Sequence, residues 1–293
     1  MARRIRVPGL VDIVLVTEPE ELRALDDDPK VDRNFAARGP LVNRLITRRI
    51  RRWFHISDQR FPSLVPRDDV VRAERQRQLF QSLPPAGGRP LATDAQLEQL
   101  ASFVRGTGAR DDAAVTVQEI VGRAFSPDYT ADQKSWKASE LIDRFREGFS
   151  LREILWRITG RLRRSRQLLI DRAQQDRWTM HGTAIGMHGV IQALDRMRDL
   201  RASPEAASLG EDEVLARCLA PPRQVPRTVE AMLATPVAAK NLRPGTLVML
   251  RLREAGPRAP RPETVFMHGH WNACPAQAFV TELVRTVWRR SSH

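Results

Sequence analysis

Cysteine is scarce in this chain of 293 residues, because Cys218 and Cys274 are the only two. Two cysteines can form at most one bridge, so the sequence excludes a scaffold that depends on several disulfides. In a reducing compartment both thiols are expected to stay free. The sequence therefore leaves at least one free thiol to explain.

Long apolar runs are missing as well. The longest run near the N-terminus, 13–16, lies between Asp12 and Glu18, far short of the roughly 20 residues that a helix needs to cross a bilayer. It also lacks the length and the cleavage site of an export signal, although arginines precede it. The sequence predicts no membrane span, and a cytoplasmic location is the expectation.

Lysine is rare, although basic charge is abundant. Only four of the 48 basic residues are lysines, and the net charge is +13. Such a field attracts nucleic acid, anionic lipid or an acidic protein. Because no nucleic-acid recognition motif accompanies the arginines, we interpret them as coding bias and expect no nucleic-acid partner. An arginine-rich nucleic-acid-binding protein remains an alternative, which predicts binding that weakens steeply with salt and does not need Cys274.

Most of the chain has the apolar spacing of helices, with a small β component. The composition, 42% hydrophobic and 28% charged, is typical of a globular protein, and we expect a single domain over residues 1–293. The apolar, β-branched patterns predict strands at 11–16 and 246–252, with a loop at 256–262. Helices are predicted at 20–25, 41–54, 68–83, 95–105, 115–124, 134–145, 150–176, 177–200, 211–218 and 276–290.

The helix predicted at 41–54 is strongly amphipathic. Leu41, Leu45 and Ile46 begin an apolar face, and arginines occupy the opposite face. A helix of this kind either contacts a membrane surface or polyanion, or packs on the core and leaves a basic face in water. We favour the second interpretation.

Cys274 directly precedes the last predicted helix. Unpaired amides and the helix dipole at such a position lower the pKa of a thiol and favour the thiolate, which binds metals. The same placement also fits a small core residue. His268 and His270 lie nearby, but they lack the paired spacing of structural zinc modules, so we do not expect zinc.

The segment from Phe266 to Cys274, FMHGHWNAC, resembles the cysteine-ligand loop of the cytochrome P450 family. That loop has a phenylalanine, a glycine and a basic residue before the cysteine, and a long helix follows. Phe266, Gly269 and Cys274 match the pattern, and Asn272 stands where the family has the basic residue. The resemblance implies that Cys274 ligates the iron of haem b and that Phe266, Gly269 and Asn272 lie against the haem.

Other segments are similar to the family in the same order along the chain. Residues 213–222 resemble its glutamate and arginine helix with the Pro-Pro turn, residues 242–250 resemble its Pro-Gly-Thr turn and strand, and residues 11–29 resemble its first strand and helix. The resemblance implies that Arg227 pairs with a haem propionate. It also implies a truncated cytochrome P450-like fold, because the chain is shorter than ordinary members.

By the same resemblance, residues 178–189 would form the long helix over the open face of the haem, with His181 and Thr183 as catalytic candidates. The family's monooxygenases have an acid before the alcohol, and neither Asp nor Glu precedes Thr183. His181 and His188 are seven residues apart and share a helix face. They could place a proton donor, or a second iron ligand, over the haem, or they could be a pair of hydrogen-bonded interior or surface histidines; the sequence leaves both interpretations open.

The resemblance implies a haem-thiolate oxidoreductase acting on a small apolar or lipid substrate. A monooxygenase would need a ferredoxin or reductase as electron donor, whereas a peroxide-using enzyme would need no protein partner. The missing acid before Thr183 favours peroxide. The alternative in the same family is a haem-binding protein without turnover.

Overall fold

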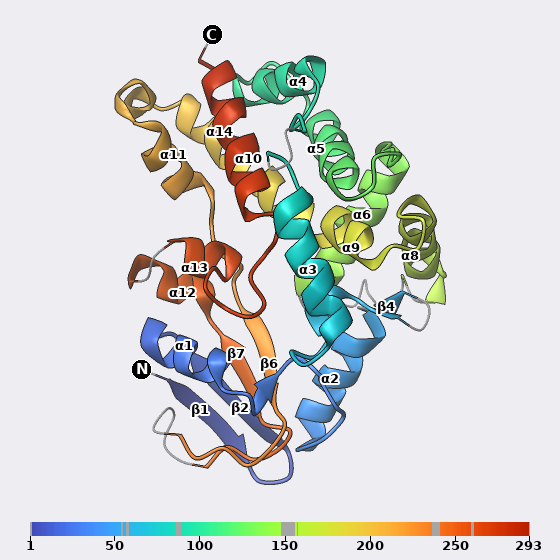
Figure 1. Ribbon diagram of the computed structural model, residues 1–293, viewed down its shortest axis with the longest axis vertical. Helices are drawn as coiled ribbons and strands as arrows, with labels where there is room; N and C mark the ends of the chain where they lie inside the picture. The colour runs from blue at the N-terminus through green and yellow to red at the C-terminus, as the bar shows by residue number, and fades with distance from the viewer. Residues whose placement is uncertain are drawn as a thin grey trace. The chain divides into compact units, whose positions relative to one another are not determined.

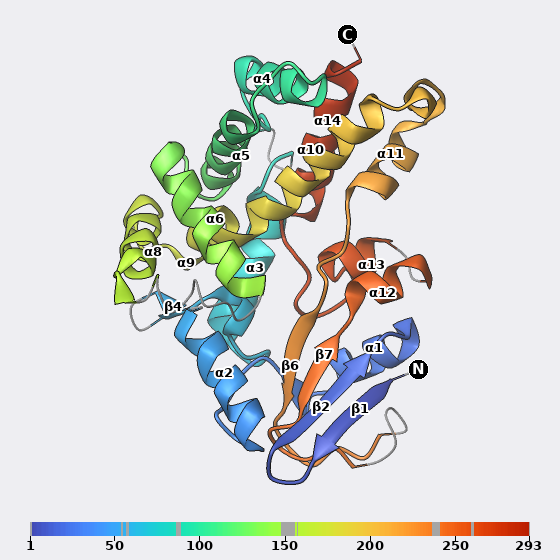
Figure 2. The same ribbon diagram turned by 180° about the vertical axis from the view of Figure 1, so that it is seen from behind.

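The computed structural model describes residues 2–53, 55–56, 59–85, 89–147, 156, 158–235, 241–258 and 261–292. These residues are mostly helical with a small mixed sheet (Figures 1 and 2). The expected fold class is therefore confirmed. The chain divides into two compact units, one of Met1–Gln78 with Pro221–Pro275 and one of Leu79–Ala220 with Ala276–His293. A single domain over residues 1–293 stays a prediction.

The first unit is built on a five-stranded sheet with short helices. Its elements are β1 (Arg3–Val7), β2 (Val11–Val16), α1 (Pro19–Asp27), β3 (Val31–Asp32), α2 (Leu41–Trp53), β4 (His55–Ile56), β5 (Gln59–Arg60), η1 (Pro62–Leu64), β6 (Val225–Val229), β7 (Leu247–Leu250), α12 (Leu252–Ala255), η5 (Gly256–Arg258) and α13 (Arg261–Phe266). The helix α3 (Val70–Ser82) begins in this unit and ends in the other.

The strands of this sheet follow the order β1-β2-β7-β6-β3, and β2 and β7 are parallel with Val14 opposite Val248. Alternate residues of β2 are buried, as expected for a strand with one covered face. Figures 1 and 2 show α1 on one face of the sheet. Val14 and Val248 pack there with Leu22 and Leu25 of α1 in one apolar cluster, which fixes α1 against the sheet.

The second unit is a helical assembly. Its elements are α4 (Asp94–Val104), α5 (Arg110–Phe125), α6 (Gln133–Glu147), α8 (Arg161–Arg172), α9 (Arg177–His181), η3 (Gly182–Gly186), α10 (Met187–Arg201), η4 (Pro204–Ser208), α11 (Glu211–Cys218) and α14 (Gln277–Arg290). The α10 helix contacts α4, α5, α11 and α14, so it is central to the core of this unit.

The helix predicted at 177–200 contains an irregular turn. The Asp176 side chain accepts a hydrogen bond from the Thr179 amide and caps α9. One π turn, η3, then separates α9 from α10. A Cβ on Gly182 would lie 2.9 Å from the ring of Phe125 in α5, so glycine permits the close approach of the two helices here.

The structure also differs from the expectations. The strands β1 and β6 were not predicted, because β1 is mostly arginine and β6 contains Pro226, which removes a backbone donor. The loop prediction at 256–262 is wrong, since η5 and the start of α13 fall there. In the predicted helix 150–176, α8 covers Arg161–Arg172, whereas residues 150–155 and 157 lie outside the described residues.

Candidate functional site

The loop that ends at Cys274 is closed by its own backbone. The Cys274 amide donates to the carbonyl of Phe266, the last residue of α13, at 2.8 Å. Two residues between them have left-handed backbone angles, Met267 with φ 54° and Gly269 with φ 80°. Glycine adopts that conformation without a steric penalty. The loop therefore holds the half-buried thiol of Cys274 two residues before Ala276, the N-cap of α14.

The α3 helix secures the loop from a distant part of the sequence. The Gln76 side chain donates to the carbonyl of Ala273 at 2.5 Å, and its own carbonyl oxygen accepts from Arg72 at 2.7 Å. Both side chains are buried. Since Ala273 adjoins Cys274, these bonds fix the backbone next to the thiol.

A buried ion pair lies under the same loop. Arg227 Nε is 2.7 Å from Asp26 Oδ1, and the two side chains are 2% and 0% exposed. His270 Nδ1 lies 3.2 Å from the other oxygen of Asp26. Burial raises the pKa of Asp26, but Arg227 and His270 lower it by more, so the net pKa is below its ordinary value. Asp26 in turn raises the pKa of His270 against the opposing effect of burial.

Four arginines surround Trp271 of the loop. Their guanidinium carbons lie 4.5 to 5.9 Å from the centroid of the indole ring, which is the range of cation–π contacts. The arginines are Arg33, Arg67, Arg72 and Arg227. The indole nitrogen donates to the carbonyl of Asp26 at 3.1 Å, so Trp271 links the arginines to the ion pair.

This cation cluster, defined as Arg33, Arg72 and Arg227 around Trp271, is short of acceptors. Burial, followed by the charges of Arg227 and Arg72, places the pKa of Arg33 well below its ordinary value. Burial also lowers the pKa of Arg72. Arg72 Nε and Arg227 Nη2 are buried and have no hydrogen-bond partner among the residues that the structure describes. Buried donors of this kind are costly unless an acceptor reaches them, so the cluster suits an anionic group such as the carboxylates of a haem.

The structure brings together most of the residues that the resemblance identified. Arg227, Phe266, Gly269, Asn272 and Cys274 all belong to the first unit. Phe266 ends α13 and holds the Cys274 amide, and the Asn272 Oδ1 atom is buried without a hydrogen-bond partner in the described part of the chain. The observed partner of Arg227 is Asp26, and its role toward a propionate stays a prediction.

His181 and Thr183 belong to the second unit. Thr183 is fully buried, and its hydroxyl donates to the carbonyl of Thr179 at 2.8 Å. His181 is half-buried at the last residue of α9. His188 Nε2 lies 2.8 Å from the hydroxyl of Ser139 in α6. His188 is therefore a hydrogen-bonded interior histidine, which was one of the two interpretations left open.

Sequence reasoning missed Asp26, Arg33, Arg72 and Gln76 as parts of this site. Asp26 directly follows the helix predicted at 20–25 and was given no role. Its signal was its position four residues after Leu22, which places a carboxylate on the apolar face of α1. Arg33 and Arg72 carried no signal, because they are two of the many arginines in the chain.

No family model matches the sequence. No curated protein matches it either. Solved structures do match, and all those described here are cytochromes P450. The enzyme CxnD, titled for C–S bond formation in chuangxinmycin biosynthesis, is 11% identical with a TM-score of 0.62, over 98% of this chain and 81% of that one. A six-coordinated cytochrome P450 from Thermus thermophilus is 17% identical with a TM-score of 0.60, over 98% and 85%.

A structure of the cytochrome P450 OleT in complex with arachidonic acid is 12% identical, with a TM-score of 0.55 over 98% of this chain and 82% of that one. The chain therefore has a cytochrome P450-like fold, as the resemblance predicted. At these identities the likeness defines the fold alone, and the chemistry rests on the residues of the site.

Two further features are absent from the residues that the structure describes. No helix among them is both long enough and apolar enough to cross a bilayer. Within the same residues, no group of three or more His, Cys, Asp or Glu side chains is arranged to hold a metal ion. A single thiolate that binds a haem iron needs no such group.

Proposed function

We propose that this protein is a haem-thiolate oxidoreductase that binds haem b through Cys274. The observation that carries the proposal is the loop itself. Its backbone holds the Cys274 thiol, and its Trp271 contacts Arg72 and Arg227, which each have a buried donor without an acceptor among the described residues. The Cys274 thiolate would ligate the iron, and Arg33, Arg72 and Arg227 would bind the carboxylates. Haem with a thiolate ligand supplies oxidising chemistry that protein side chains cannot perform.

The residues of the chain have separate roles in this proposal. The Gln76 bond to Ala273 and the Cys274 bond to Phe266 orient the thiol and limit its movement. Phe266, Gly269 and Asn272 would line the thiolate side. The buried Asp26 balances one of the arginine charges, so that the cluster remains cationic without being left wholly uncompensated.

His181 and Thr183 are proposed to handle protons on the substrate side. The Thr183 hydroxyl donates to a backbone carbonyl, so it is oriented. The residue directly before Thr183 is Gly182, where the family's monooxygenases have an acid. Delivery of protons for oxygen cleavage needs a positioned acid. We therefore favour a peroxide as oxidant over oxygen with a ferredoxin or reductase.

The proposed substrate is a small apolar molecule or a lipid, and a cytoplasmic location fits the sequence. The OleT structure in complex with arachidonic acid supports a fatty acid as the first substrate to test. The alternative is a cytochrome P450-like protein that binds haem without turnover, which the missing acid before Thr183 also favours.

Two measurements, made one after the other, test the proposal. Titration of the purified protein with haemin should show saturable binding at one haem per chain, and the complex should then oxidise a fatty acid when hydrogen peroxide is added. Haem binding without turnover, with peroxide or with a ferredoxin and its reductase, would select the non-catalytic alternative. Failure to bind haem would contradict the proposal itself.

A further inference from the structure

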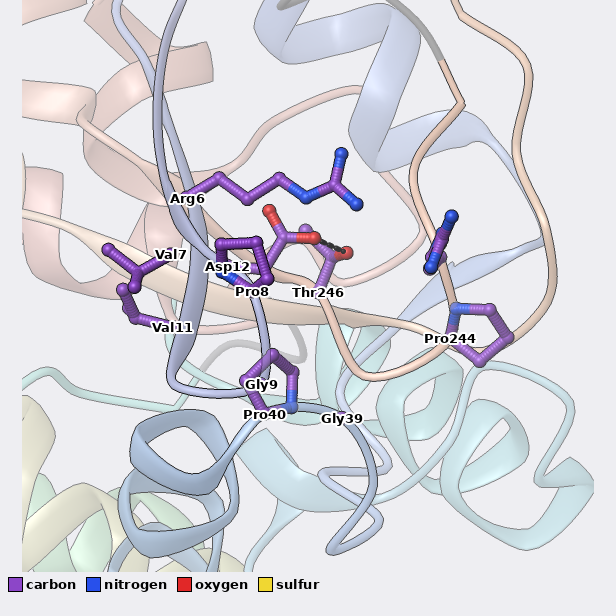
Figure 3. Close-up of a pocket in the computed structure, with 11 residues that line it drawn as sticks. Arg6, Val7, Pro8, Gly9, Val11, Asp12, Gly39, Pro40, Pro244 and Thr246 are labelled. Atoms are coloured by element: carbon purple, nitrogen blue, oxygen red, sulfur yellow. Dashed lines mark hydrogen bonds between the residues drawn. The ribbon is translucent and has the colours of Figure 1, made fainter.

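A cavity of about 210 Å³ opens in the first unit, away from the residues of the cation cluster. Three segments line it: the turn between β1 and β2, the residues ahead of α2, and the turn that leads into β7. Figure 3 shows the Arg6 side chain extending across it above Asp12 and Thr246, with Pro244 on the far side. Pockets for drug-sized molecules begin near about 300 Å³, so this cavity suits a small group.

Two glycines in close contact join the segments that line the cavity, since Gly39 lines it and Gly245 lies between the lining residues Pro244 and Thr246. Gly39 and Gly245 both have φ 85°, and a Cβ on Gly39 would lie 2.6 Å from the carbonyl oxygen of Gly245. The Asn43 side chain also donates to the carbonyls of Asp12 and Gly245, at 2.6 and 2.8 Å. These contacts hold the loops together, so little ordering is needed when a ligand binds.

The charge of the cavity is positive. The Asp12 carboxylate accepts two hydrogen bonds from Arg4, both of 2.8 Å, and one of 2.9 Å from the Thr246 hydroxyl. Arg4 therefore compensates Asp12. Arg6 and Arg243 line the same cavity, and neither side chain forms a hydrogen bond or ion pair within the described part of the chain. The charge of Arg6 contributes to the lowered pKa of Asp12, but three arginines face one carboxylate here. Two guanidinium groups are thus left over for an anion.

Apolar side chains border this positive cavity. Val7, which lines it, and the adjacent Leu10 are each 46% exposed, and Leu41 at the start of α2 is 47% exposed. The Leu41 amide donates to the carbonyl of Gly9 at 3.1 Å, so α2 begins directly beside the hairpin turn. An arginine-lined pocket with an apolar border fits the headgroup and upper chain of an anionic lipid.

We propose that this cavity binds a phosphate-bearing anion, with Arg6 and Arg243 as the charged donors. Guanidinium groups bind phosphate oxygens through paired, charge-assisted hydrogen bonds. The phosphate comes either from free inorganic phosphate or from an anionic phospholipid. The site uses none of the residues assigned to haem, so its test is independent of the proposed function.

The test compares two double variants of the full chain. R6Q/R243Q removes both donors, and R3Q/R253Q removes the same charge from exposed positions of the same unit that do not line the cavity. Each protein is titrated calorimetrically with inorganic phosphate at constant ionic strength. Each is also sedimented with vesicles of phosphatidylcholine, with or without phosphatidic acid. The thermal midpoint of each variant shows that it is folded.

We expect the wild type and R3Q/R253Q to bind the phosphate group. R6Q/R243Q should bind it at least about tenfold more weakly, because each charge-assisted bond contributes at least that factor. Binding of phosphate alone identifies the free ion as the source, and binding of phosphatidic acid vesicles identifies the lipid headgroup. The proposal is overturned if the wild type binds neither source. It is also overturned if R6Q/R243Q binds as the wild type does, or if R3Q/R253Q loses as much.

Discussion

The two units bury polar groups in contrasting ways. In the first unit, Arg227 and Asp26 form a buried ion pair among further buried arginines, so net positive charge is enclosed there. Both units contain buried donors without acceptors among the described residues, such as Arg227 Nη2 in the first and Trp178 Nε1 in the second. In the second, Ser139 and His188 bond to each other at 2.8 Å, with Asp143 3.8 Å from the second ring nitrogen of His188. A hydrogen bond of this kind contributes to stability without a ligand. The enclosed positive charge distinguishes the first unit, and the proposal of an anionic ligand rests on it.

The largest expected effect breaks the ion pair of the first unit. D26N leaves Arg227 buried without its carboxylate, and removal of one partner of a buried pair costs about 3 to 5 kcal/mol of unfolding free energy. Urea denaturation of the variant measures this. The exposed Glu20 of the same helix provides the control E20Q, which should change stability by less than about 0.5 kcal/mol. Equal stabilities of D26N and E20Q would mean that the ion pair is unimportant.

The packing of the second unit is tested with two glycines on its central helix. G182A places a Cβ against the Phe125 ring and should destabilise by about 1 to 3 kcal/mol. G189A meets nothing within 4 Å inside α10, so it should stabilise by about 0.5 to 1 kcal/mol. Thermal or urea unfolding of both variants measures the change in unfolding free energy, which should be a loss for G182A and a gain for G189A. The same sign for both would contradict the close approach at Gly182.

The ligand role of the cation cluster is tested with neighbouring arginines of α3. R72Q removes a buried guanidinium beside Trp271, whereas R75Q removes a half-buried one whose side chain donates, among the described residues, only a long bond of 3.5 Å to Gln78. Because hydrogen bonds to charged groups contribute about 1.5 to 3 kcal/mol, R72Q should weaken haem binding about tenfold or more. Haemin titrations should show no comparable loss for R75Q. Equal affinities would exclude Arg72 from the site.

The smallest effect is the pH dependence of the loop. The folded pKa of His270 is raised by Asp26 above its ordinary value of about 6.5. Its contribution to stability is therefore fully present below about pH 6.5 and is lost as the pH rises through the raised folded value. The difference in unfolding free energy between wild type and H270Q should shrink by up to about 1 kcal/mol over that rise. If the difference in unfolding free energy between wild type and H270Q grew with pH, the raised folded pKa of His270 would be contradicted.

The sequence predicted the regular elements better than the polar contacts. The apolar, β-branched pattern of residues 11–16 and the apolar face of the last helix both depend on the spacing of nearby residues. Accordingly, β2 and α14 lie where they were expected. The resemblance also identified Cys274 and the loop before it. These features are readable because neighbouring residues determine them.

The partners within the site were not predictable in this way. Arg227 bonds to Asp26 across 201 positions of the chain, and Gln76 reaches Ala273 across 197. Such pairs form only when α1, α3 and β6 are brought to the loop by tertiary folding. Many arginines surround these positions in the sequence, and burial alone distinguishes Arg33 and Arg72 from the others.

The most direct test is the absorption spectrum of the haem-loaded protein after reduction and exposure to carbon monoxide. A thiolate ligand gives a strongly red-shifted band, which the wild type should show and C274A should lack. C218A removes the other cysteine, which is buried in α11, and should keep the band. A red-shifted band that persists in C274A, or a wild-type spectrum without it, would contradict ligation by Cys274.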